Sequence, residues 1–330
     1  MKARGIMIAG TAALAACSVL GMALAAAQAS SASTPTWTQQ HPATSPLTRS
    51  FAVMADDAAT GTVVLFGGAS NSGSGQNLGD TWTWNGTTWT KQAPPVHPSA
   101  RSDAAMAYDA ATRTVVLFGG LGRGVELADT WTWNGTTWTK QHPAVSPPAQ
   151  ATSVMAYDAA TRTIVLFDTT GATWTWNGTT WTKQHTKVHP IARSEAVMAY
   201  DAATGTVVLF GGFGNGGVTS VLGDTWTWDG KKWTQQHPAA SPPGRILAAM
   251  AYDAAIGTVV LFGGEDSSDN VLGDTWTWDG TTWTQQHPAT SPPARVSPAM
   301  AEDAATGTTV LFGGFTSAVG FGDTWTWGRP

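Results

Sequence analysis

Short apolar stretches alternate with polar turns along most of the chain, and the same order of stretches returns several times. One copy contains an apolar stretch at Ala105–Asp109, a β-branched stretch at Thr114–Phe118, an alternating stretch at Thr130–Trp133 and a fourth around Trp138. Stretches of this length, separated by turn-forming residues, are typical of antiparallel strands. The pattern therefore predicts an all-β protein built from units of four short strands.

The third and fourth stretches of this copy are joined by Asn134 and Gly135. Asn-Gly is a strong hairpin signal, because a type I′ turn requires a positive φ at both central residues. Asn-Gly-Thr is also a glycosylation sequon. Other copies carry Asp-Gly at the same place, as in Asp279 and Gly280. This exchange of Asn for Asp favours the turn.

The second stretch of each copy ends in phenylalanine, and these residues measure the period of the repeat. They are Phe66, Phe118, Phe167, Phe210, Phe262 and Phe312. Successive members lie 43 to 52 residues apart. Self-similarity near 50 residues is typical of propellers and solenoids.

The tryptophans predict how the repeat closes. Trp-Thr-Trp occurs in all six units, and a further tryptophan marks the fourth strand of the first five. The sixth unit ends at Trp327 and lacks that strand, whereas residues 37–42 repeat residues 283–288 letter for letter. We therefore expect a six-bladed β-propeller of four-stranded antiparallel blades, whose last blade is completed by the N-terminal strand around Trp37. Closure would also protect sheet edges from aggregation.

The Gly pair after the second strand, the Asp before the third strand and the spaced aromatic residues resemble the kelch-repeat propellers and the similar propeller of galactose oxidase. The resemblance covers residues 35–330. The chain departs from the family in using Trp where Tyr is frequent, and in carrying Asp168 and Thr169 in place of one Gly pair. Kelch propellers include sugar oxidases, a sialic acid mutarotase and many binding modules, so the fold alone does not select a function.

The copper-radical chemistry of galactose oxidase is not supported by this sequence. That chemistry, as the resemblance implies it, needs a Tyr joined to a Cys together with further Tyr and His ligands. Cys17 is the only cysteine, and it lies in the N-terminal leader. The four tyrosines occupy one repeat position: Tyr108, Tyr157, Tyr200 and Tyr252.

The first residues have the order of a secretory signal peptide. Lys2 and Arg4 precede an apolar stretch that ends at Ala27, and small residues allow cleavage after Ala29. We expect a signal peptide at 1–29, a single propeller domain at 30–330, and a secreted, extracellular protein. Two alternatives remain, a lipoprotein anchored to the cell envelope through Cys17 and an uncleaved membrane anchor.

Composition narrows the class of partner and cofactor. The formal net charge is −5 and only 12% of residues are charged, so attraction to nucleic-acid phosphates is not expected. One cysteine cannot form an internal disulfide or a cysteine-rich metal site. No phosphate loop, zinc motif or nucleophile elbow occurs. We expect a monomer without cofactor or metal, which meets a membrane only through a lipid on Cys17.

Candidate ligand contacts lie on the face that carries the inter-blade linkers and the loops between second and third strands. These loops vary in length, and variable loops on a repeated scaffold often carry recognition. One repeat position before the first strand holds five arginines: Arg49, Arg101, Arg193, Arg245 and Arg295. They could grip carboxylates or phosphates, or they could brace each blade against its loop. Asp103 and Glu195, each two residues after an Arg, break the repeat and are candidates for ligand contact or acid–base chemistry.

The repeat symmetry favours binding over catalysis, because an active site needs one asymmetric constellation of residues. No catalytic set is recognised. We expect a secreted or envelope-associated module that binds a glycan or protein partner on the variable-loop face. One alternative is a mutarotase-like propeller enzyme that acts on an acidic sugar through the Arg ring with Asp103 and Glu195. A passive envelope scaffold is the other alternative.

Overall fold

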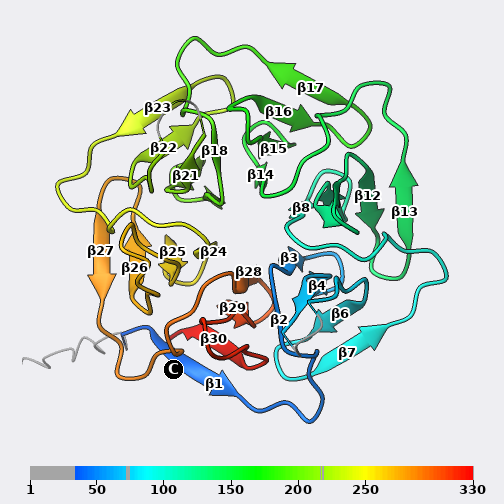
Figure 1. Ribbon diagram of the computed structural model, residues 1–330, viewed down its shortest axis with the longest axis horizontal. Helices are drawn as coiled ribbons and strands as arrows, with labels where there is room; N and C mark the ends of the chain where they lie inside the picture. The colour runs from blue at the N-terminus through cyan, green and yellow to red at the C-terminus, as the bar shows by residue number, and fades with distance from the viewer. Residues whose placement is uncertain (1–33, 72–74, 216, 218, 330) are drawn as a thin grey trace, which may run out of the picture. The chain divides into compact units, whose positions relative to one another are not determined.

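The computed structural model describes residues 34–71, 75–215, 217 and 219–329. The signal peptide predicted for residues 1–29 lies outside these residues. Thr34 to Pro330 form one compact unit. Figure 1 shows six blades arranged around a central axis, with the chain passing from blade to blade in sequence order. The predicted all-β, six-bladed propeller is confirmed.

Each blade is a four-stranded antiparallel sheet in which strands follow one another outward from the axis. The innermost strands are β3 (Val53–Asp57), β8 (Ala105–Asp109), β14 (Val154–Asp158), β19 (Val197–Asp201), β24 (Ala249–Asp253) and β28 (Ala299–Asp303). The second strands are β4 (Thr62–Phe66), β9 (Thr114–Phe118), β15 (Thr163–Phe167), β20 (Thr206–Phe210), β25 (Thr258–Phe262) and β29 (Thr308–Phe312).

The two outer strands of each blade carry the tryptophans. The third strands are β6 (Thr81–Trp84), β12 (Thr130–Trp133), β16 (Thr173–Trp176), β22 (Thr225–Trp228), β26 (Thr275–Trp278) and β30 (Thr324–Gly328). The outermost strands are β7 (Trp89–Gln92), β13 (Trp138–Gln141), β17 (Trp181–Gln184), β23 (Trp233–Gln236), β27 (Trp283–Gln286) and, in the sixth blade, β1 (Thr36–Gln40).

The predicted closure of the ring is also confirmed. β1 pairs antiparallel with β30, and Trp37 lies opposite Trp327 in the register. The Trp37 indole donates from Nε1 to Oγ1 of Thr275 in the fifth blade at 2.9 Å. Its ring also packs edge-on against Phe262 of that blade, with centroids 5.3 Å apart. The N-terminal strand therefore completes the sixth blade and fastens it to the fifth.

The hydrophobic core lies between neighbouring blades, and the outer tryptophans repeat one contact around the ring. Trp138 of the second blade packs edge-on against Phe66 of the first, with centroids 5.4 Å apart, and donates from Nε1 to Oγ1 of Thr81 at 2.9 Å. Both partners are buried, so the indole N–H has an acceptor although water is excluded. Aromatic packing and one hydrogen bond thus join each blade to the one before it.

Three short pairs of strands extend the loops above the blades. They are β2 (Arg49–Ser50) with β5 (Ala69–Ser70), β10 (Leu121–Gly122) with β11 (Val125–Glu126), and β18 (Arg193–Ser194) with β21 (Phe213–Gly214). β2 and β18 begin at arginines of the predicted ring. The pairs that contain β2 and β18 fix the chain just before it enters the innermost strand, where the candidate site lies, whereas β10 and β11 form a hairpin within the loop between β9 and β12.

Candidate functional site

Alternation of strand direction gives the propeller two different faces. One face, the loop face, carries the inter-blade linkers and the loops between second and third strands. The opposite face, the turn face, carries the turns between first and second strands and the Asn-Gly or Asp-Gly hairpins. The innermost strands enter from the loop face and leave at the turn face. Each end of the central channel is therefore lined by one repeat position from each blade.

Six residues, which we call the mouth ring, surround the channel at the loop face. Each precedes an innermost strand and has a left-handed backbone with φ between 52° and 59°. They are Phe51, Asp103, Thr152, Glu195, Leu247 and Ser297. Such a φ costs a residue other than glycine about 1–2 kcal/mol. All six blades therefore enter the innermost strand through the same strained conformation.

The strained backbone is held by hydrogen bonds that run from blade to blade. Asp103 N donates to the Phe51 carbonyl at 3.1 Å, and Thr152 N donates to the Asp103 carbonyl at 3.0 Å. Leu247, Ser297 and Phe51 continue the series, each donating to the ring residue of the preceding blade. The mouth is therefore a rigid frame whose side chains are free to differ.

The side chains of the mouth ring do not follow the sixfold symmetry. They line a depression of about 170 Å³ together with the first residues of the innermost strands. Asp103 and Glu195 belong to the second and fourth blades, with Thr152 of the third blade between them. Phe51 and Leu247 supply apolar surface to the same depression. One opening thus combines two carboxyl groups, hydroxyl groups and an aromatic ring.

Both carboxyl groups of the mouth ring hold protons more tightly than usual. Burial raises the pKa of Asp103, and a hydrogen bond from Ser102 partly opposes the effect. Burial also raises the pKa of Glu195, and the charges of Asp103 and Glu265 raise it further. Because the carboxylates disfavour each other, one ligand that donates hydrogen bonds to both would relieve their repulsion. The structure thus brings together the two acids that the sequence analysis selected.

The five arginines of the predicted ring are buried, and each forms an ion pair within its own blade. Arg101 donates from Nη1 and Nη2 to the two carboxylate oxygens of Asp129 at 2.6 and 3.0 Å. Nη1 also reaches the Gly119 carbonyl at 2.9 Å, and Nε reaches the Ser99 carbonyl at 3.0 Å. Arg49, Arg193, Arg245 and Arg295 repeat the pairing with Asp80, Asp224, Asp274 and Asp323.

These bonds occupy the guanidinium groups and fix the loop between the second and third strands. Asp129 also accepts the indole N–H of Trp131 at 2.7 Å. Burial alone would raise the pKa of Asp129, but the bonds from Arg101 and Trp131 hold it below the usual value. Direct contact between these arginines and a ligand stays a prediction. Their geometry is that of the alternative in the sequence analysis, in which the arginines brace each blade against its loop.

The third blade replaces this ion pair with another arrangement. Gln150 stands where the other blades have Arg, and Ala172 stands where they have the paired Asp. The buried Asp168, which takes the place of the first glycine, accepts the Trp174 indole N–H at 3.0 Å. It also accepts the backbone N–H groups of Thr170 and Ala172 at 2.9 and 2.8 Å. The Asp168 carboxylate thus supports the shorter loop of this blade, and the rim here lacks the arginine.

The turn face of the channel holds a second asymmetric ring, which the sequence analysis did not single out. Its depression of about 320 Å³ is lined by one residue at the same position of each innermost strand. Four blades supply tyrosine there, whereas the first and sixth blades supply Asp56 and Glu302. These blades are neighbours, and Asp56 accepts the backbone N–H of Ala304 in the sixth blade at 3.4 Å.

Among the carboxyl groups of the described residues, these two acids have the most strongly raised pKa values. Burial raises the pKa of Asp56 to about 7, and the charge of Glu302 contributes to the increase. Burial likewise raises the pKa of Glu302 to about 7. The sequence contained the signal, because only these two units break the run of tyrosines. The sequence analysis noted the four tyrosines but not the acids that replace them in the other two units.

Methionine and alanine side chains line the channel between the two rings. Met54, Met106, Met155, Met198, Met250 and Met300 project from the six innermost strands. Within the described ranges, no three His, Cys, Asp or Glu residues are grouped to hold a metal ion. Residues 34–329, apart from the few left undescribed, also contain no helix long and apolar enough to cross a membrane.

Comparison of the chain with protein-family models gives no match, and a search of curated proteins finds no relative. The family resemblance is therefore not confirmed by these comparisons. The features of this chain that bear on its function are the six-bladed fold and the asymmetric positions within it.

Proposed function

We propose that this protein is a secreted or envelope-associated binding module of the kelch-repeat type that takes a glycan at the mouth ring. A β-propeller of repeated blades suits a binding or scaffold module in general. The observation that supports the finer proposal is the break of symmetry at the loop face. Four different kinds of side chain meet there on a frame whose backbone is the same in every blade.

The chemistry of the mouth ring fits a hydroxyl-rich ligand. Carboxylates accept hydrogen bonds from sugar hydroxyls, and the Thr152 hydroxyl can donate or accept. The ring of Phe51 offers an apolar face for the C–H surface of a sugar. A protein partner with serine, threonine or asparagine at its contact surface would use the same groups. We favour the glycan because the depression is small and its polar groups converge.

The acidic partner expected of an arginine ring is less well supported at this mouth. The five guanidinium groups lie in ion pairs, and the groups that line the depression are carboxyls rather than cations. A neutral or amino-bearing sugar therefore suits the mouth better than a carboxylated one. Such a ligand would not have to overcome repulsion from Asp103 and Glu195.

The test is a glycan and cell-wall polysaccharide array probed with the purified wild-type protein and with D103N/E195Q. These substitutions keep the size of both side chains while removing their charge. We expect a defined set of neutral or amino sugars to bind the wild type, and the variant to lose most of that signal. An array without specific binding, or one that both proteins bind equally, would refute the proposal.

A second candidate function is supported by the raised pKa values of Asp103 and Glu195. A carboxyl group that holds its proton more tightly than usual is suited to act as a general acid, and an ionised neighbour can act as a base. The mouth would then catalyse proton transfer on a bound sugar, as a mutarotase-like enzyme does. Sugars from the array can be tested by following anomer exchange by NMR. Exchange no faster than in buffer would leave binding as the function.

A further inference from the structure

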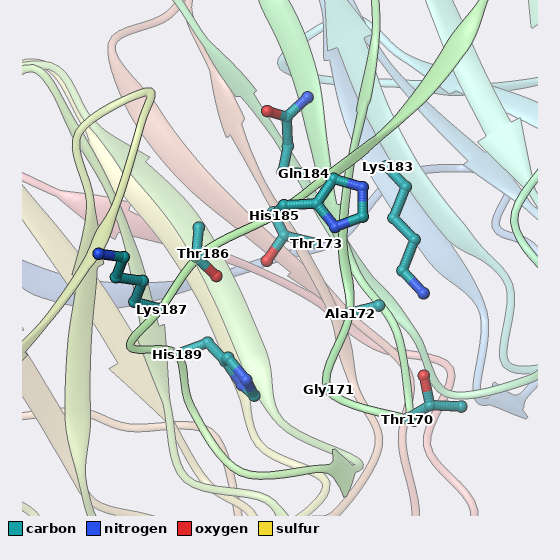
Figure 2. A pocket seen from close by; sticks show the side chains of 10 residues that line it. All are labelled: Thr170, Gly171, Ala172, Thr173, Lys183, Gln184, His185, Thr186, Lys187 and His189. Carbon is teal, nitrogen blue, oxygen red and sulfur yellow. The ribbon is translucent and has the colours of Figure 1, made fainter.

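The third blade has a basic rim on the loop face. Its short loop and the linker that follows β17 enclose a depression of about 420 Å³ (Figure 2). The lining includes Lys183 from the strand, Lys187 and His189 from the linker, and Thr170 and Ala172 from the short loop. This lining contains two lysines and two histidines and no acidic residue.

The third blade lacks both members of the Arg–Asp pair, so the basic character of its rim comes from the lysines of the lining. Every other blade has an aspartate just before its third strand, as at Asp129. In the third blade that position is Ala172, and the compensating Asp168 is buried and holds the loop from inside. The carboxylate that would have faced the rim is therefore absent.

The linker adds a lysine and a histidine where four of the other five linkers carry alanine and serine. Lys187 takes the place of the alanine, and His189 takes the place of the serine. In Figure 2 the side chain of Lys183 extends towards Thr170 and Ala172, while Lys187 and His189 lie on the segment beyond β17. The rim thus draws one lysine from the strand and one from the linker.

Neither lysine of this rim forms an ion pair among the described residues. The five ion pairs among the described residues all join arginine to aspartate. The Lys183 ammonium instead lies 5.8 Å from the centre of the Trp174 ring. His189 Nδ1 lies 2.9 Å from the Pro190 carbonyl, and a carbonyl can only accept, so Nδ1 carries a proton. The ring is thereby oriented by the backbone of the linker.

The first blade shows what the same place looks like with the carboxylate present. Its rim depression is lined by Lys91 and His97, but Asp80 faces it as well. Asp80 is bound to Arg49 at 2.7 Å. An anion approaching this rim would meet a carboxylate beside the lysine. The third blade alone combines the lysine and histidines with an alanine at that position.

We infer that the rim of the third blade binds an acidic sugar through its carboxylate or sulfate group. Lysine ammonium groups are strong donors to such oxyanions. A volume of about 420 Å³ also falls in the range of ordinary small-molecule sites, about 300–1,000 Å³. There is room for a sugar unit besides its anionic group. This site does not depend on the mouth ring. Acidic ligands would bind at the rim of the third blade, and neutral ligands at the mouth ring.

The test compares K183Q/K187A/H189S with a charge-matched control, K91Q/K140Q. Each substitution in the first variant installs the residue that other blades have at that position, so both proteins should fold. The probes are an oligogalacturonate for carboxylates, a heparin-derived oligosaccharide for sulfates, and neutral maltotriose, titrated by calorimetry at low and at physiological ionic strength. Inorganic phosphate shows whether a bare oxyanion suffices.

We expect at least one acidic probe to bind the wild type, and its affinity to fall about tenfold or more in K183Q/K187A/H189S. The control variant should stay within about twofold of wild type, and D103N/E195Q should bind the acidic probe as wild type does. Equal losses in the two lysine variants would mean that only overall charge matters, and this would overturn the inference. Absence of acidic-sugar binding by the wild type at low salt would overturn it as well.

Discussion

The paired acids Asp56 and Glu302 at the turn face should make the stability of this propeller fall as the pH rises. In the folded protein burial raises the pKa of both groups from 3.8 and 4.5 to about 7. The unfolded chain releases the same protons near pH 4. The folded state therefore holds more protons between about pH 4 and pH 7, and the free energy of unfolding decreases with pH in that window.

The magnitude follows from the proton affinities. Each tenfold change in proton affinity corresponds to about 1.4 kcal/mol, so Asp56 alone would cost on the order of 4 kcal/mol above pH 7 if fully screened from water. Both side chains are only partly buried, and water at the open channel reduces the cost. For the pair together we expect about 2–4 kcal/mol between pH 4 and pH 8.

The assay is denaturant unfolding of wild type and D56N/E302Q at several pH values from 4 to 8. The neutral variant should gain stability relative to wild type as the pH rises, with most of the gain below pH 7. D229N/D279N is the control, because it also removes two carboxylates but from exposed hairpin turns where other units carry asparagine. A difference between D56N/E302Q and wild type that does not change with pH would refute the reasoning.

Three further predictions concern the contacts that hold the blades, and all are read from denaturant unfolding. Arg101→Ala leaves the Asp129 carboxylate without its cation and should lower the free energy of unfolding by about 3–5 kcal/mol. Adding Asp129→Ala to this variant should recover part of the lost stability. Absence of any recovery would contradict the bracing role. Thr130→Val removes the acceptor of the Trp181 indole at 2.9 Å and should cost about 1–3 kcal/mol, and a neutral result would mean that the bond is dispensable. Trp37→Ala should lower the free energy of unfolding by about 3–5 kcal/mol and expose the junction between the fifth and sixth blades to proteolysis. Unchanged stability and protease resistance would mean that β1 adds nothing to closure.

The sequence predicted the architecture well because each blade repeats the same pattern of strand-forming and turn-forming residues. The stretch Thr130–Trp133 alternates strictly and is β12, and Asn134 with Gly135 joins it to the next strand. The missing sixth copy of the outer tryptophan located the closing strand, since a blade without it would leave an open edge. Because of this repetition, the number and positions of the tryptophans were enough to predict the topology.

The candidate site was harder to predict because it depends on which side chains meet. The sequence placed Arg101 near the channel, but it could not show that Asp129, two strands later in the same blade, occupies the guanidinium group. Likewise, the exchange of a Gly pair for Asp168 and Thr169 did not reveal that this carboxylate replaces the bracing ion pair. Pairing of distant polar groups becomes visible only when the blade is folded.

The central claim is that the mouth ring on the loop face binds a neutral or amino sugar. It is tested most directly by titrating the tightest sugar from the array into variants altered at three places. These are D103N/E195Q at the mouth ring, D56N/E302Q at the turn face and K183Q/K187A/H189S at the rim of the third blade. The account predicts a loss of affinity of about tenfold or more in the first variant and less than about twofold in the other two. Equal affinity in all three variants, or a loss confined to either of the other two, would contradict it.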